Sequence, residues 1–93
     1  MNKTEQRFLT LVRSNRMRSF YAAHKVIKDI STPVLYTAAN ELISRASYLY
    51  MTETSEKADC ANQLASQITG ILARRDQDVT ELDAKIIENA QVF

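Results

Sequence analysis

Apolar residues recur at steps of three and four along most of this 93-residue chain, which is the spacing of one face of an α-helix. Stripes of this kind cover about residues 5–29, 33–52, 56–75 and 79–91. The strict alternation typical of β-strands is hard to find, and a single glycine and a single proline leave little material for tight turns. The pattern therefore predicts helices over those four ranges.

The first of these ranges contains a candidate joint. Thr4 is a suitable cap for a helix that begins at Glu5, and Ser14 with Asn15 then interrupts the apolar pattern. The sequence leaves open whether one long helix covers residues 5–29 or whether the helix is broken at Ser14 and Asn15.

Capping residues mark the starts of the later helices. Thr32 precedes Pro33, and proline is tolerated at the first helical position because an N–H there would have no partner in the helix. Ser55 can cap the third range, and Asp78 with Glu81 has the spacing of a capping box. We expect the clearest boundary of the chain at Thr32 and Pro33.

Short connections between amphipathic helices favour antiparallel neighbours. We expect an all-α protein, a compact antiparallel bundle of four to five helices that forms one domain over residues 1–93. A glycine inside a helix costs about 1 kcal/mol relative to alanine, so Gly70 predicts close packing against another helix, or a local kink. The expected core consists of Phe8, Leu9, Val12, Met17, Phe20, His24, Ile27, Leu35, Ala38, Ala39, Leu42, Ala46, Leu49, Cys60, Ala61, Leu64, Ala65, Ile68, Ile71, Leu72, Val79, Leu82, Ile86 and Ala90, with Phe93 as a further candidate.

The composition narrows the class of protein. Apolar residues make up 45% and charged residues 25%, as in ordinary globular proteins. A chain this short buries only about two-thirds of its unfolded surface, so a homodimer is one way to add buried area. The charged N-terminus and the lack of any run of roughly 18 apolar residues argue against a leader and against a membrane partner. Cys60, the single cysteine, cannot form an internal disulfide, and we expect a cytoplasmic protein.

The net charge of +1 conceals an uneven distribution along the chain. Residues 1–30 hold seven basic and two acidic residues, which gives +5, whereas residues 31–93 hold five basic and nine acidic residues, which gives −4. The positive charge is therefore concentrated in the first third of the sequence.

The sequence offers little material for catalysis, cofactor binding or metal binding. A phosphate-binding loop needs several glycines, and a zinc site needs several His or Cys ligands. The acidic run from Asp76 to Asp83 fails as a calcium loop, because Glu81 occupies the glycine position and Ile87 the position of the bidentate glutamate. His24 and Cys60 both lie on apolar faces and are interpreted as structural, although only the fold decides whether they meet. We expect no enzyme, no cofactor and no metal.

Two surfaces are candidates for binding a partner. One is basic: on an unbroken first helix Arg7, Arg18 and Lys25 would form a ridge. A joint at Ser14 and Asn15 would instead leave Arg13, Arg16 and Arg18 as a cluster at the break. The alternative is that these cations pair internally with the acidic helices. The basic candidates are Arg7, Arg13, Arg16, Arg18, Lys25 and Lys28.

The second surface is an aromatic edge formed by Tyr36, Ile43 and Tyr50, which lie seven residues apart beside the core stripe. Aromatic residues at a helix margin are favoured at protein interfaces, and the alternative is that they widen the core.

Two functions fit these surfaces. The first is a small non-enzymatic protein-binding module, such as an adaptor, regulator or inhibitor. The second is a nucleic-acid-binding regulator that uses the basic N-terminal helix, although the near-neutral pI of 7.9 is low for that class. We favour a protein partner and retain nucleic acid as the alternative.

Overall fold

A computed structural model describes residues 1–52 and 55–92 of the chain. Over these residues the protein is all-α, as the sequence predicts, and contains no strand. The three later helices begin and end within one residue of their predicted limits. The elements are α1 (Lys3–Arg13), α2 (Met17–His24), the short 3-10 helix η1 (Ile27–Asp29), α3 (Thr32–Thr52), α4 (Ser55–Arg74) and α5 (Thr80–Val92).

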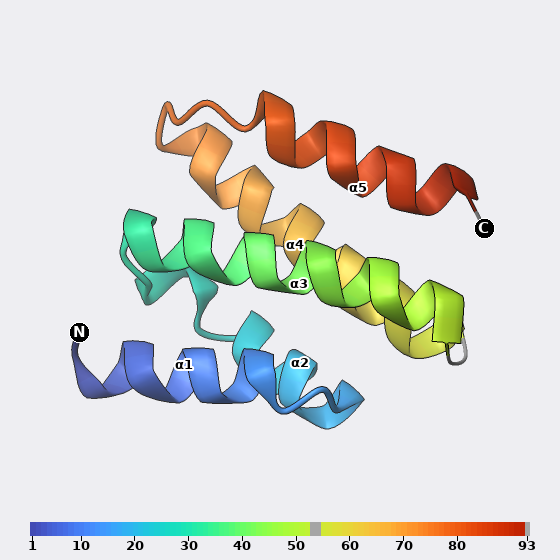
Figure 1. Ribbon diagram of the computed structural model, residues 1–93. Helices are drawn as coiled ribbons and strands as arrows, with labels where there is room; N and C mark the ends of the chain where they lie inside the picture. Colours follow the sequence, from blue (N-terminus) through green and yellow to red (C-terminus); the bar gives the residue numbers. More distant parts are fainter. Residues whose placement is uncertain (53–54, 93) are drawn as a thin grey trace.

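The helices pack in two layers. Figure 1 shows α1, α3 and α5 side by side in the foreground, with α2 and α4 behind them. The long helices α3 and α4 run antiparallel and form the central pair, which α2 contacts through α4 and α5 contacts through both. The predicted compact antiparallel arrangement is therefore confirmed, with five α-helices in the described residues.

The first predicted range is broken, and Asn15 is the residue at the break. Its φ of 58° lies in the left-handed region, which asparagine tolerates better than most residues. Before it, both the backbone N–H and the hydroxyl of Ser14 donate to the carbonyl of Leu11. The chain leaves α1 there and starts a separate helix, α2, at Met17.

Two of the predicted caps are wrong in detail. Helix α1 begins earlier than expected, because Asn2 rather than Thr4 caps it in a capping box with Glu5. At the start of α5, Asp78 accepts a hydrogen bond from the N–H of Thr80, two residues on, instead of pairing with Glu81. The side chains of Ser55 and Phe93, predicted as a cap and a core residue, lie outside the described part of the chain.

Most of the predicted core is buried, with informative exceptions. His24 is exposed, because α2 turns its Phe20 and Ala23 face inward and ends at His24. Ala90 on α5 is also exposed. Both predictions of burial are therefore wrong, whereas four other predicted core residues are half-buried: Met17, Cys60, Val79 and Ile86.

Gly70 does not mark a close helix contact. A Cβ atom added there would meet only Arg74 Nη2, at 3.6 Å, which is an ordinary van der Waals distance. The expectation of tight packing at Gly70 is therefore wrong.

Candidate functional site

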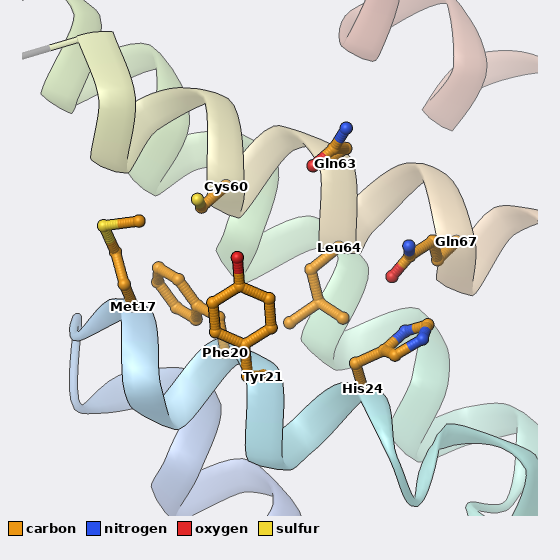
Figure 2. Close-up of a pocket in the computed structure, with 8 residues that line it drawn as sticks. All are labelled: Met17, Phe20, Tyr21, His24, Cys60, Gln63, Leu64 and Gln67. Atoms are coloured by element: carbon orange, nitrogen blue, oxygen red, sulfur yellow. The ribbon is translucent and has the colours of Figure 1, made fainter.

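A hollow of about 170 Å³ lies between α2 and α4. Figure 2 shows side chains of the two helices facing one another across it. We call it the α2–α4 hollow, and its lining consists of Met17, Phe20, Tyr21 and His24 from α2 and Cys60, Gln63, Leu64 and Gln67 from α4.

The hollow has an apolar floor and an exposed rim. Phe20 and Leu64, which are only 4% and 3% exposed, belong to the core and form the floor. Met17 and Cys60 are half-buried, whereas Tyr21 stands 66% exposed at the rim. An apolar group that entered from solvent would contact core side chains directly.

Two cations stand beside the hollow. Arg18 and Lys25 flank Tyr21 at steps of three and four residues, so all three lie on one side of α2, and Lys25 keeps helical backbone angles. Both cations are exposed, and no salt bridge in the described part of the chain involves either of them. We call Arg18 and Lys25 the basic rim. None of the eight lining residues is acidic.

The break after α1 decides between the predicted arrangements of the basic residues. Because α1 ends at Arg13, Arg7 is not on the same helix as Arg18 and Lys25, and a continuous ridge does not form. Arg13 and Arg16 instead lie at the two ends of the joint between α1 and α2. The alternative prediction, a cluster at the break, describes the structure better.

Internal pairing accounts for one of the basic candidates. Arg13 donates through Nε and Nη2 to the two carboxylate oxygens of Glu41, each at 2.8 Å. This hydrogen bonding raises the pKa of Arg13 and lowers the pKa of Glu41. In the described residues it is the one salt bridge that joins residues 1–30 to the acidic remainder. The exposed basic candidates that form no such bridge there are Arg7, Arg16, Arg18, Lys25 and Lys28.

Two arginines from the acidic part of the chain donate hydrogen bonds to backbone carbonyls. Arg45 on α3 donates to the carbonyl of Val12, near the end of α1, at 3.1 Å. Arg75, which follows α4, donates to the carbonyls of Ile30 at 2.8 Å and Lys28 at 3.1 Å. These bonds satisfy carbonyls at helix ends that have no partner within their own helix.

The predicted aromatic edge packs against its own chain. The Tyr36 hydroxyl donates to the carbonyl of Asp78 at 2.7 Å, and the Tyr50 hydroxyl donates to the carboxylate of Asp59. Burial, with the hydrogen bond to Asp59, raises the pKa of Tyr50 to about 12. Ile43 is buried in the core. This placement fits the alternative in which the three residues widen the core, and their role in binding a partner stays a prediction.

His24 and Cys60 both line the hollow but do not form a catalytic pair. Burial raises the pKa of the Cys60 thiol, and Glu56 and Asp59 raise it further, which disfavours the thiolate, the nucleophilic form. Figure 2 shows His24 at the other end of the hollow from Cys60. Among the described residues, no group of three or more His, Cys, Asp and Glu side chains is placed to hold a metal ion.

Sequence reasoning did not single out Tyr21, Gln63 or Gln67. The spacing of Arg18, Tyr21 and Lys25 was a usable signal, because it places an exposed tyrosine between two cations on one helical face. Nothing in the sequence around Gln63 and Gln67 indicated that α4 lines a hollow, because the hollow depends on how α2 packs against α4.

Comparison with protein-family models, curated proteins and solved structures finds no match to this chain. In the described residues no helix combines the length and apolar character needed to cross a membrane. The described residues form a five-helix all-α globule, and a fold of this kind does not by itself indicate a function.

Proposed function

We propose that this chain is a small non-enzymatic protein-binding module, an adaptor, regulator or inhibitor, that docks α2 and its basic rim onto a partner protein. The supporting observation is the α2–α4 hollow, where an apolar floor adjoins two exposed cations with no acidic partner in the described chain. Protein interfaces combine a desolvated apolar anchor with a polar or charged border in this way.

The proposed setting is the cytoplasm. Cys60 is a free thiol, which suits a reducing compartment. A homodimer would add buried surface to so short a chain, and light scattering of the purified chain at several concentrations distinguishes it from a monomer.

Affinity capture from nuclease-treated extract of the host cell tests the proposal. The wild-type chain is expected to recover a stoichiometric protein partner, and Tyr21→Ala is expected to lose it. Tyr48→Ala is the matched control, because Tyr48 lies on α3 and is 63% exposed, close to the 66% of Tyr21. Recovery of nucleic acid alone, or a partner that Tyr21→Ala retains, would reject docking through α2.

A second candidate function, nucleic-acid binding, has one specific observation in its favour. Helices α1 and α2 are short and are separated by three residues, Ser14 to Arg16, as in helix-turn-helix proteins. Tyr21 between two cations would also suit base stacking. The apolar floor of the hollow and the pI of 7.9 favour a protein instead. In gel shifts with random duplex DNA and single-stranded RNA, no complex at low salt would exclude this function.

A further inference from the structure

The dimensions of the α2–α4 hollow limit what it can hold. Its volume of about 170 Å³ is close to that of an engineered apolar cavity of about 150 Å³ that accepts benzene. Sites that enclose drug-sized ligands are larger, about 300–1,000 Å³. With Phe20 and Leu64 as its floor, the hollow fits one branched aliphatic or aromatic side chain and is too small for a nucleotide or a large cofactor.

The charges around the hollow are unevenly distributed. Arg18 and Lys25 stand along α2, and two glutamines form the exposed α4 side of the rim. The acidic residues that act on the site, Glu56 and Asp59, lie at its Cys60 end, where they raise the pKa of that thiol. A carboxylate on a segment lying along α2 would therefore meet two cations on the way to the floor.

We propose that the α2–α4 hollow receives one apolar side chain from an acidic segment of a partner protein, whose Asp or Glu residues lie over Arg18 and Lys25. This inference rests on the proposed protein-binding function and adds the chemistry of the partner. The apolar anchor supplies most of the lifetime of the complex, and the charge attraction speeds association and weakens as salt is added.

Selection from a displayed library of random dodecapeptides on the full-length chain tests the inference. The enriched peptides are expected to carry a leucine, methionine or phenylalanine flanked by Asp or Glu. A fluorescein-labelled copy of an enriched peptide then reports affinity by anisotropy at low and high salt. Replacing its anchor with alanine, or introducing Tyr21→Ala, is expected to weaken binding about tenfold or more. Arg18→Glu combined with Lys25→Glu is expected to weaken binding and to reverse its salt dependence, because the like charges then repel and added salt screens the repulsion.

Matched controls separate the hollow from the rest of the surface. Tyr48→Ala on α3 and Lys3→Glu on α1 make the same kinds of change at other exposed positions, and both are expected to leave the affinity unchanged. Circular dichroism and urea unfolding of every variant confirm that it folds.

Each contrary outcome overturns a stated part of the inference. Neutral or basic enriched peptides, or no enrichment at all, would overturn the acidic segment, and binding that survives Tyr21→Ala would overturn the hollow as its site. The proposed function would stand in these cases if affinity capture still recovers a protein. If the chain self-associates and Tyr21→Ala, at the rim of the hollow, abolishes this, the occupant is a second copy and not a separate partner.

Discussion

Gly70 occupies a helical position where a side chain has room. An added Cβ would contact only Arg74 Nη2 at 3.6 Å, and glycine in a helix interior costs conformational entropy that alanine does not. Gly70→Ala is therefore expected to raise the free energy of unfolding by about 0.5–1 kcal/mol, which is about 4 °C in Tm. Urea and thermal unfolding measure both values. If Gly70→Ala lowered the free energy of unfolding instead, a neighbouring helix would have to pack directly against Gly70.

Glu5 is a buried carboxylate that joins two parts of the chain. Its Oε2 accepts the N–H of Ser31 at 2.9 Å, and its Oε1 accepts the N–H of Asn2 at 3.4 Å. Hydrogen bonding from the hydroxyl and N–H of Ser31, with that from Asn2, lowers the pKa of Glu5 below its ordinary value. A lowered pKa stabilises the fold when the pH lies above the unfolded value, and the contribution disappears as the pH falls through the folded value.

Glu5→Gln is accordingly expected to unfold at lower urea concentration than wild type at pH 7. The difference should shrink as the pH falls below about 4, where the carboxylate is protonated in the unfolded chain. Glu88→Gln, at an exposed position on α5, is the control and should change little. A deficit for Glu5→Gln that persists unchanged in acid would show that its charge is not what stabilises the fold.

The same residue explains why one cap was misplaced. Thr4 and Asn2 are both good capping residues, and local propensity does not decide which of them caps α1. Glu5 decides in favour of Asn2, because it completes the capping box with Asn2 while it accepts a hydrogen bond from Ser31 in a distant part of the chain. The first ten residues of the sequence give no sign of this hydrogen bond between Glu5 and Ser31.

At the scale of the helices, the spacing of apolar residues alone predicted the limits of a helix correctly where one face of that helix is continuously buried. The stripe from Leu35 to Leu49 is such a case, and α3 matches its prediction within one residue. Residues 5–29 were ambiguous, because their apolar spacing fits both a continuous and a broken helix. The break depends on Asn15 adopting a positive φ and on Phe20 packing into the core, and the second condition is tertiary.

Arg75 connects the end of α4 to the segment that leads into α3. It donates to the carbonyls of Lys28 and Ile30 and to the hydroxyl of Thr32. Arg75→Met keeps most of the aliphatic length but leaves these acceptors without their donor, so the expected loss is about 2 kcal/mol in urea unfolding. Arg13→Met, which removes an exposed ion pair with Glu41, is the comparison and should cost less. Equal losses would show that the ion pair matters as much as the bonds from Arg75.

At the scale of the whole molecule, the sequence indicated the two cations of the basic rim but not the hollow beside them. Charge can be counted along the chain, and the cations of α2 were all candidates. The hollow exists because Phe20 and Leu64, which are 44 positions apart, pack together in the core. Neither residue is unusual in its own helix, so only the packing of α2 on α4 shows where an apolar group could enter.

Helix α5 is attached to the rest of the molecule more loosely than α3 and α4 are attached to each other. Among its described side chains only Leu82 and Asn89 are buried. Asn89 donates to the carbonyl of Ile43 and to Oδ1 of Asn62, each at 3.2 Å, and Asn62 donates to the carbonyl of Ile86 at 3.1 Å. A buried polar link of this kind holds α5 in register but adds little apolar burial.

Local opening should therefore begin at α5. In native-state hydrogen exchange, the amides of α5 are expected to exchange faster than those in the middle of α3 and α4. Asn89→Ala leaves Asn62 and the Ile43 carbonyl short of a partner, so it should lower the opening free energy of α5 by about 1–2 kcal/mol. Gln91→Ala, an exposed change on the same helix, should leave exchange in α5 unchanged. Equal protection of all three helices in the wild type would instead mean that α5 opens only when the whole molecule unfolds, and that Asn89 stabilises the fold globally.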